Sequence, residues 1–380
     1  MSGNKTIFFF RIIFCAIFLI ANLVLFSNNS VAQNYDQYPN ISGKVLFESR
    51  SDSVVSSNKS DISKNYSLVN IEPAFSLNIN NNWSVKTNWR ISPFYDRDNS
   101  RPERFREVLS QNRGLQFDKE DLLVEQLKGE FQNDDMKFFF GKFNPAFGTA
   151  WKRDKKIGIF TSDFTRDYEL REKIGVGGAA VLEKSEISLN GFFNDVSDLS
   201  STALNRRKRE STSDGVAGNT STLSSYTVAI DGKDFFDVAN LTYNFGYSKL
   251  AVNNIQNRAD QNGYVGGLEY AIPIGINTYL IPYMEVAKIN NMAGESDRNA
   301  LYITTALTGK YNGWTASISR VGRNIRQKNI YGNVRDHQIQ ATAGYKFRNN
   351  ISVDITRMNL KEDGYSASLL GVLVSYIYQF

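Results

Sequence analysis

The chain has 380 residues and a formal net charge of +5, with 44 Lys and Arg residues against 39 Asp and Glu residues. A charge this small and this dispersed does not indicate a nucleic acid as a partner. One cysteine, Cys15, and one histidine, His337, are too few for a disulfide or for a metal site built from these side chains. We therefore predict no metal and no cofactor.

Residues 1–32 have the features of an export signal. Lys5 and Arg11 supply a positive n-region, and residues 12–26 form a nearly unbroken apolar run. Ser30-Val31-Ala32 gives small residues at a cleavage site. The apolar run is shorter than the roughly 20 residues of a spanning helix. We therefore favour a cleaved signal peptide over a retained transmembrane anchor.

The mature chain then consists of a short N-terminal segment, 33–39, and one domain, 40–380. Its formal charge is about +3, because the signal removes Lys5 and Arg11 and no acid. No second long apolar run follows, which excludes a bundle of transmembrane helices. A transmembrane β-barrel stays open, because half of its strand residues face water.

From residue 40 onward, apolar and polar side chains alternate in short segments. In the segment 83–95, Trp83, Val85 and Trp89 alternate with polar residues. Successive side chains of a strand face opposite sides, so such a segment has one apolar and one polar face. We predict about sixteen strands, near residues 41–48, 66–80, 83–95, 119–132, 136–143, 168–182, 186–195, 225–232, 236–251, 263–273, 277–290, 299–310, 314–323, 336–347, 351–360 and 366–380.

The connections between these segments alternate between short and long. An outer-membrane barrel has short turns at one end, longer loops at the other and an even number of strands. Pro73 and Pro282 fall inside predicted strands, where we expect bulges because proline donates no ladder hydrogen bond. Segments 277–290 and 299–310 alternate poorly, so fourteen or eighteen strands stay open. The predicted long loops are 49–65, 96–118, 144–167, 196–224, 252–262 and 324–335.

A secreted β-sandwich or solenoid would also show alternating strands. Neither explains the repeated Trp, Tyr and Phe near strand ends, which suit the aromatic girdles of a membrane barrel. We therefore predict an all-β fold, a transmembrane antiparallel β-barrel of about sixteen strands.

The last segment has the most regular alternation. Its apolar side chains recur at every second residue back from the end of the chain, with Gly371, Ser375 and Gln379 between them. This pattern resembles the C-terminal assembly signal of outer-membrane proteins, which implies the barrel-insertion machinery as a partner. The predicted assembly residues are Val374, Tyr376, Tyr378 and Phe380.

Two motifs lie between residues 141 and 175. Gly141-Lys142-Phe143-Asn144-Pro145-Ala146-Phe147-Gly148-Thr149-Ala150-Trp151 precedes Asp167-Tyr168-Glu169-Leu170-Arg171-Glu172-Lys173-Ile174-Gly175. Together they resemble the Gram-negative porin family, most closely the alphaproteobacterial porins. The resemblance covers most of the mature chain and implies a homotrimer. Residues 152–158 depart from the family pattern, which puts an inherited ion preference in doubt.

The resemblance also implies that the third long loop folds into the barrel with an inward constriction. A sixteen-strand barrel encloses an aqueous channel that such a loop would narrow. Basic rings select anions, so we expect a modest anion preference, with a nearly unselective pore as the alternative. The predicted constriction residues are Lys152, Arg153, Asp154, Lys155, Lys156 and Asp163, and the predicted pore-wall residues are Lys86, Arg90, Lys128, Arg171 and Lys173.

Arg206-Arg207-Lys208-Arg209 is a basic run in the fourth long loop. It would meet lipopolysaccharide or a neighbouring subunit, or serve only as a solvated loop. An enzyme is disfavoured, because His337 has no serine nearby in sequence for a Ser/His pair.

We predict a porin that lets small hydrophilic solutes diffuse passively across a bacterial outer membrane. Two alternatives stay open. One is a substrate-specific channel for phosphate, another anion or a sugar. The other is a non-transporting surface barrel that acts as an adhesin or a structural anchor.

Overall fold

The computed structural model describes residues 37–58, 65–93, 114–115, 120–204, 207–253, 258–327 and 332–380. The predicted signal peptide, 1–32, lies outside the described residues. Within the described part, none of the helices has the length and apolar character to cross a bilayer.

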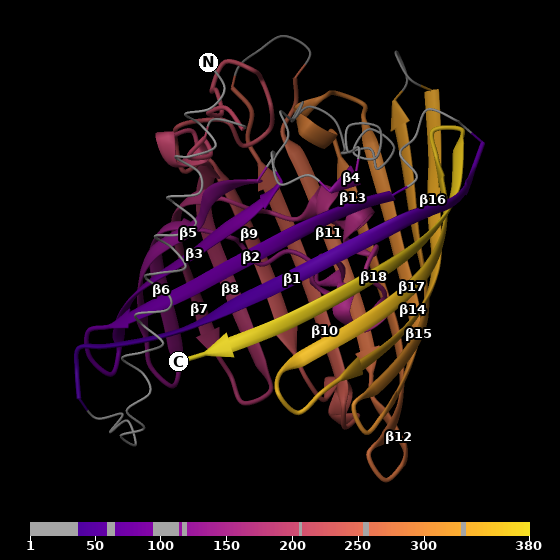
Figure 1. Ribbon diagram of the computed structural model, residues 1–380. Coiled ribbons are helices and arrows are strands. Elements are labelled where there is room, and N and C mark those ends of the chain that lie inside the picture. The colour runs from indigo at the N-terminus through magenta and orange to yellow at the C-terminus, as the bar shows by residue number, and fades with distance from the viewer. Residues whose placement is uncertain are drawn as a thin grey trace, which may run out of the picture.

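Sixteen long antiparallel strands form one closed sheet in the part of the chain that the structure describes, which confirms the predicted barrel (Figure 1). Each strand pairs with the next along the chain, and β1 pairs with β18 to close the ring. The strands are β1 (Asn40–Ser57), β2 (Asn65–Asn78), β3 (Trp83–Pro93), β5 (Glu120–Gln132), β6 (Met136–Phe143), β7 (Lys173–Val181), β8 (Ser185–Asn194), β9 (Ser225–Gly232), β10 (Leu241–Leu250), β11 (Gln261–Tyr270), β13 (Thr278–Asn290), β14 (Asn299–Tyr311), β15 (Trp314–Gln327), β16 (Gly332–Lys346), β17 (Ile351–Glu362) and β18 (Tyr365–Gln379).

Two further strands are short. β4 (Gly114–Leu115) pairs in parallel with β2, and β12 (Ile272–Gly275) continues β11 along β13. The helical segments are η1 (Ala150–Lys152), α3 (Asp154–Ile157), α4 (Ser162–Thr165), η2 (Arg166–Tyr168), η3 (Asp198–Ser200), η4 (Phe235–Asp237) and η5 (Met292–Gly294).

The first strand is longer than the sequence pattern predicted. It continues past residue 48 to Ser57, where Ser49 and Ser51 still pair with Val374 and Val372 of β18. The alternation stops there because the outward positions of β1 carry serine. Ser67 of β2 donates a hydrogen bond to Ser51 at 2.9 Å, so this outward patch is polar on both strands.

Two predicted strands begin too early. Residues 166–168 form η2, a part of the third long loop, and β7 begins only at Lys173. Residues 235–237 form η4, in which Phe236 has a φ of 51° and turns the chain before β10. In both places apolar residues gave an alternating pattern to a segment that turns.

The expected bulges at the two prolines are wrong. Pro73 and Pro282 stay in regular register with Val45 of β1 and Leu307 of β14. On its other side each proline leaves a gap in the ladder, and pairing resumes in the same register. The missing donor therefore interrupts hydrogen bonding without adding a residue.

Most of the outward face of the barrel is apolar. Leu127, Phe138, Leu189 and Leu268 are examples of large outward side chains left exposed on the isolated chain. Aromatic pairs lie near the short turns, with Trp83 against Phe131 at 5.2 Å and Trp314 against Tyr345 at 4.7 Å between ring centroids. This arrangement fits a lipid-facing wall with an aromatic girdle at the short-turn end.

The last connection at the long-loop end is an exception to the predicted alternation. β17 and β18 are joined by Asp363 and Gly364 alone, with φ angles of 47° and 75°. Two positive φ angles in a two-residue hairpin are typical of a type I′ turn. Asp363 and Gly364 therefore form a tight turn, and the long-loop end of the barrel has this short connection among its long loops.

Candidate functional site

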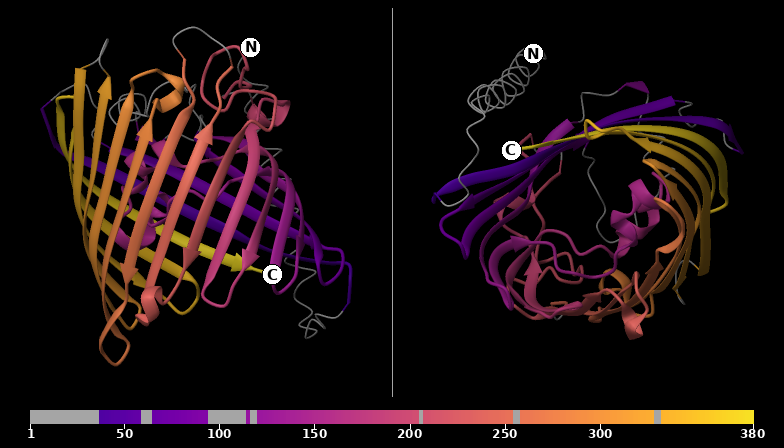
Figure 2. Two further views of the ribbon diagram at one scale, coloured as in Figure 1. Left: turned by 180° about the vertical axis from the view of Figure 1, so that it is seen from behind. Right: turned by 90° about the horizontal axis from the view of Figure 1, so that it is seen from below.

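The third long connection, residues 144–172, folds into the ring of strands, as Figure 2 shows in the view from below. We call this segment the inserted loop. It contains η1, α3, α4 and η2 and lies against the inner side of β10 to β18. Its inward course confirms what the motifs in the sequence implied.

Glu285 of β13 fixes the start of the inserted loop. Its buried carboxylate accepts hydrogen bonds from the backbone N–H groups of Thr149, at 2.7 Å, and Ala150, at 3.1 Å. The hydroxyls of Thr149, Tyr168 and Tyr283 also donate to it, at 2.9, 2.8 and 3.1 Å. Among the described residues no cation lies within ion-pair distance of Glu285, so hydrogen bonds alone compensate this charge.

Tyr168 brings the end of the inserted loop to the same carboxylate. Burial, followed by the nearby charge of Glu285, raises the pKa of Tyr168 well above its ordinary value. The hydroxyl therefore stays protonated and donates. One carboxylate thus joins two parts of the loop that are about twenty residues apart in the sequence.

Two neighbouring strands hold the middle of the loop through its backbone. Ser319 of β15 donates to the carbonyl of Ile157 at 2.6 Å. Gln338 of β16 donates to the carbonyl of Phe160 at 2.6 Å, and Gln340 accepts from the N–H of Phe160 at 3.2 Å. These polar wall residues therefore bind protein backbone where other wall residues would meet water.

The inserted loop also brings its own apolar surface. Ile159, Phe160 and Phe164 are fully buried against the inner side of β15, β17 and β18. Leu369 and Leu373 of β18 belong to the same cluster, so this part of the inner wall is apolar. Burial of large side chains stabilises by about 1.5–3 kcal/mol each, which makes this cluster a major contribution to docking.

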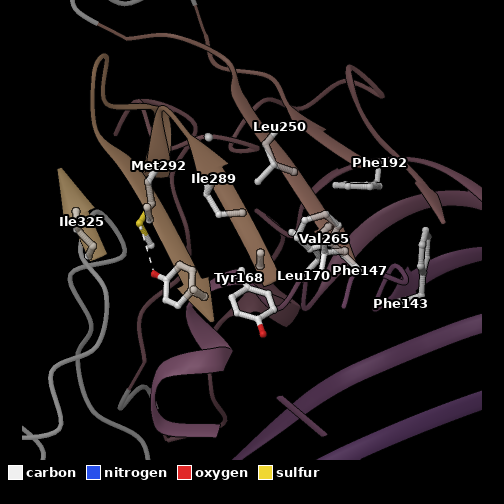
Figure 3. Close-up of a cluster of buried hydrophobic side chains, with 14 residues drawn as sticks. Phe143, Phe147, Tyr168, Leu170, Phe192, Leu250, Val265, Ile289, Met292 and Ile325 are labelled. Carbon is white, nitrogen blue, oxygen red and sulfur yellow. Dashed lines mark hydrogen bonds between the residues drawn. The ribbon is translucent and has the colours of Figure 1, made fainter. Parts of the chain in front are cut away.

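A second apolar cluster covers the neighbouring wall (Figure 3). Phe147, Tyr168 and Leu170 come from the inserted loop, and Val265 and Ile289 come from β11 and β13. The loop therefore lies on a continuous inner surface from β11 to β18.

Arg323 of β15 binds the end of the loop. Its guanidinium contacts Asp167 of the loop at 3.0 Å and Asp336 and Glu362 of the wall at 2.7 Å each. It also lies 4.3 Å from the ring centroid of Phe164. All four charged side chains are buried, so loss of Arg323 would leave three carboxylates close together.

Arg50 of β1 contacts the loop from the other side. It pairs with Asp52 at 2.9 Å, donates to the carbonyl of Ile159 at 3.4 Å and lies 3.8 Å from Asp163. Its guanidinium is 4.4 Å from the ring centroid of Phe160. The predicted constriction residue Asp163 is therefore part of an ion-pair network with the wall.

The predicted basic constriction residues occupy different environments. Arg153 pairs with Glu269 of β11, and its guanidinium lies 4.2 Å from the ring centroid of Tyr283. Lys152 is exposed, and Lys156 is exposed at 3.7 Å from the same Glu269. Asp154 and Lys155 begin α3, and their side chains lie outside the described ones.

The predicted wall residues of β3 and β5 do face inward. Lys86 and Lys128 both bind Glu130, at 2.5 and 2.7 Å. Arg90 pairs with Glu125, the extra residue where the β3–β5 register shifts. Each of these basic side chains therefore has a carboxylate partner.

The last two predicted wall residues, Arg171 and Lys173, lie just before and at the start of β7. Arg171 precedes β7 and so belongs to the inserted loop, which corrects its assignment to the wall; it pairs with Glu169 at 3.2 Å. Lys173 is buried and donates to Asn194 at 2.6 Å. The wall thus carries less uncompensated positive charge than the sequence suggested.

The basic run 206–209 is not a free patch. Arg206 lies outside the described residues, while Arg207 binds both oxygens of Glu172, at 2.7 and 2.5 Å. Burial would raise the pKa of Glu172, but hydrogen bonds and charge from Arg207, with Lys142, lower it to about 2. Arg209 pairs with Asp198 of the same loop at 3.0 Å, whereas Arg207 joins the fourth loop to Glu172 at the end of the inserted loop.

Sequence reasoning missed the anchors Glu285, Arg323 and Arg50. A signal was present, because segments 277–290 and 299–310 alternated poorly. Their inward positions include Tyr283, Ala287, Ile289, Ala300 and Tyr302, which are buried under the inserted loop. Poor alternation thus marked the wall that the loop covers.

No protein-family model matches the sequence, and no curated protein matches it. Solved structures do match. OmpF of Salmonella typhi in complex with daunomycin has a TM-score of 0.59 at 14% identity, over 90% of this chain and 98% of that chain.

Two further matches have similar coverage. OccAB3 of Acinetobacter baumannii has a TM-score of 0.53 at 8% identity, over 90% of this chain and 100% of that chain. OccK1 (OpdK) of Pseudomonas aeruginosa has a TM-score of 0.52 at 8% identity, over 90% and 99%. At these identities the similarity concerns the fold. The chain therefore has the fold of the outer-membrane porins, a closed antiparallel barrel of sixteen strands.

Proposed function

We propose that this protein is a porin and not an enzyme, a passive channel for small hydrophilic solutes across a bacterial outer membrane. The observation that carries the proposal is the inserted loop, held inside a closed barrel by Glu285, Arg323 and the apolar clusters. A loop fixed at that position narrows the aqueous channel of the barrel, and this role requires no binding pocket for one particular solute. The short-turn end faces the periplasm in this proposal.

The charge distribution supports a weak anion preference. Lys152 and Lys156 are exposed on the inserted loop, and Arg153, Lys152 and Lys310 are the electrostatic neighbours of Lys156. Glu269 offsets only part of this positive charge. The wall lysines Lys86 and Lys128 share one carboxylate, which leaves a small positive excess there as well. A weakly basic lining favours anions modestly.

Planar-bilayer conductance of the purified protein tests both the proposed channel and its proposed anion preference. We expect stable ion-conducting steps and, under a KCl gradient, a reversal potential on the anion side. The variant K152Q/K156Q should move that potential toward zero. The control K346Q/R348Q removes the same charge at a short turn and should leave it unchanged. Absence of conductance would refute the channel, whereas cation selectivity of the wild type would refute only the anion preference.

The finer assignments belong to the same proposal. The two motifs of the inserted loop support a relation to alphaproteobacterial porins, and the porin fold supports a homotrimer. Val374 and Tyr376 face outward on β18, and Tyr378 stacks on Phe380 at 5.8 Å between ring centroids. We assign this aromatic end to recognition by the barrel-insertion machinery.

A further inference from the structure

The outward face of β15 to β17 carries a cluster of basic side chains. By strand parity, the outward positions of β15 include Arg320 and Arg326, since Trp314 and Ile318 on the same face are exposed. Arg335 on β16 and Arg357 and Lys361 on β17 are exposed on the same side of the sheet. Such charges are costly on a lipid-facing wall and need an explanation.

The register places these side chains on adjacent rows. Lys361 lies directly opposite His337, which lies opposite Gly322, and Arg320 lies two residues before Gly322 on β15. Arg357 lies opposite Ala341, four residues from Lys361. β16 pairs with β15 on one side and with β17 on the other, so the three strands lie side by side. We call Arg320, Arg326, Arg335, His337, Arg357 and Lys361 the basic band.

No carboxylate neutralises the basic band among the described residues. None of its five Arg and Lys side chains has a carboxylate within 4.0 Å in that part of the chain. The inward acids Asp336 and Glu362 bind Arg323 on the other face of the sheet. The band is therefore an uncompensated positive surface on the outside of the barrel.

The band lies in the half of the wall toward the long loops. Arg320 is six residues beyond Trp314, or about 20 Å along the strand at roughly 3.3 Å per residue. At a strand tilt of about 40° this is roughly 15 Å above the girdle, within an apolar band about 25 Å tall. Long basic side chains at this depth extend toward the interface and meet polar headgroups there.

A second copy of the chain is a poor occupant. The described outward positions of β1 to β3 and β13 to β18 hold no Asp or Glu, so these faces offer no countercharge. Below the band the outward side chains are apolar, with Leu307, Ile318 and Ile355 exposed. A basic row above an apolar wall matches a molecule with an anionic head and acyl chains.

We propose that the basic band binds the phosphorylated headgroup of an acylated glycolipid in the outer leaflet, of the lipopolysaccharide type. The guanidinium groups hold the phosphates, since Arg binds phosphate in a bidentate way. The acyl chains lie along the apolar wall below. The site rests on the proposed location in the outer membrane but not on channel activity. A protein that conducts ions but fails to bind such a lipid would therefore refute the lipid site and leave the channel proposal intact.

The test is binding of diphosphorylated lipid A to the purified full-length protein in neutral detergent. The variant R320Q/R357Q/K361Q should bind on the order of 100-fold more weakly, at about a factor of five for each charge near an anionic headgroup. The control K249Q/K346Q/R348Q removes three positive charges outside the band and should bind like the wild type. Unchanged affinity in the first variant would overturn the proposal.

Two further arms separate the alternatives. Wild-type protein should prefer diphosphorylated over dephosphorylated lipid A, and equal binding would overturn the phosphate assignment even if the triple variant failed to fold. Millimolar inorganic phosphate should not displace the lipid, and displacement would indicate a site for free phosphate. A changed oligomeric state of R320Q/R357Q/K361Q at unchanged lipid affinity would identify a second copy as the occupant.

Discussion

Glu285→Gln is the most direct test of how the inserted loop is held. The substitution keeps the shape of the side chain but replaces one acceptor oxygen with an NH2 donor. Placed at the Oε1 position, this donor meets the hydroxyl of Tyr168 and the backbone N–H of Ala150. The hydroxyl can turn and accept, whereas the N–H of Ala150 cannot.

The expected effect follows from that orphaned donor. A buried N–H without an acceptor costs about 2 kcal/mol. Removing the buried charge of Glu285 is favourable, but the hydrogen bonds that Thr149 and Tyr283 donate to a neutral amide oxygen are weaker. These two effects offset each other. About 2 kcal/mol corresponds to a roughly 30-fold larger population of undocked loop, since about 1.4 kcal/mol is tenfold.

Limited proteolysis of the folded barrel measures this population. Trypsin should cleave the variant at the basic residues 152–156 about 30-fold faster than the wild type, provided opening is fast relative to cleavage. Single-channel current noise should rise in parallel. Heat-modifiable migration should stay unchanged, because the strand ladders are intact. Glu186→Gln is the matched control, since Glu186 pairs with Lys137 on another part of the wall.

Equal cleavage rates for Glu285→Gln and the wild type would refute this account of docking. The loop would then be held by its apolar clusters and by its contacts with Arg323 and Arg50, with no measurable contribution from Glu285.

Two further predictions concern buried charge. Arg323→Gln should lower the denaturant midpoint of the barrel, because breaking a buried ion pair costs about 3–5 kcal/mol and here leaves Asp167, Asp336 and Glu362 together; an unchanged midpoint would contradict it. For the fourth loop, the pKa of Glu172 lies at about 2, below that of an unfolded Glu at about 4.3. Its contribution is therefore complete above about pH 4.3 and is lost as pH falls through about 2. The hydrogen-exchange protection of residues 196–204, taken relative to the intrinsic exchange rate at each pH, should stay high from pH 7 to 5 and fall toward pH 2, and in Arg207→Gln the fall should begin at higher pH.

Much of the fold could be predicted from two-residue periodicity. β6 and β9 begin and end where the pattern placed them, since large apolar side chains recur at their outward positions, Met136, Phe138 and Phe140 in β6 and Tyr226 and Val228 in β9. β1 was cut short because Ser49 and Ser51 occupy outward positions. A pattern of hydrophobicity has no means to recognise a strand whose lipid side is polar.

The site was predictable in location and less so in detail. The motifs around Pro145 and Tyr168 identified the inserted loop, but its partners on the wall lie more than a hundred residues away in the sequence. The Thr149 to Glu285 contact spans 136 residues, and its existence depends on barrel closure. Pairing of Lys86 and Lys128 with one Glu130 also follows from strand register, which the pattern of a single strand does not contain.

Two departures from simple alternation in this barrel correspond to a further surface that lies against the wall. Where the inserted loop covers β13, inward Ala287 and Ile289 are apolar although they face the interior. Where outward Arg357 and Lys361 lie on β17, the wall is basic although it faces lipid. The inserted loop explains the apolar inward residues of β13. By the same reasoning, the basic outward residues of β17 indicate a partner that is anionic instead of apolar. An anionic headgroup is such a partner, which is why lipid binding and loop docking have the same physical basis: a sheet face takes the polarity of what lies against it.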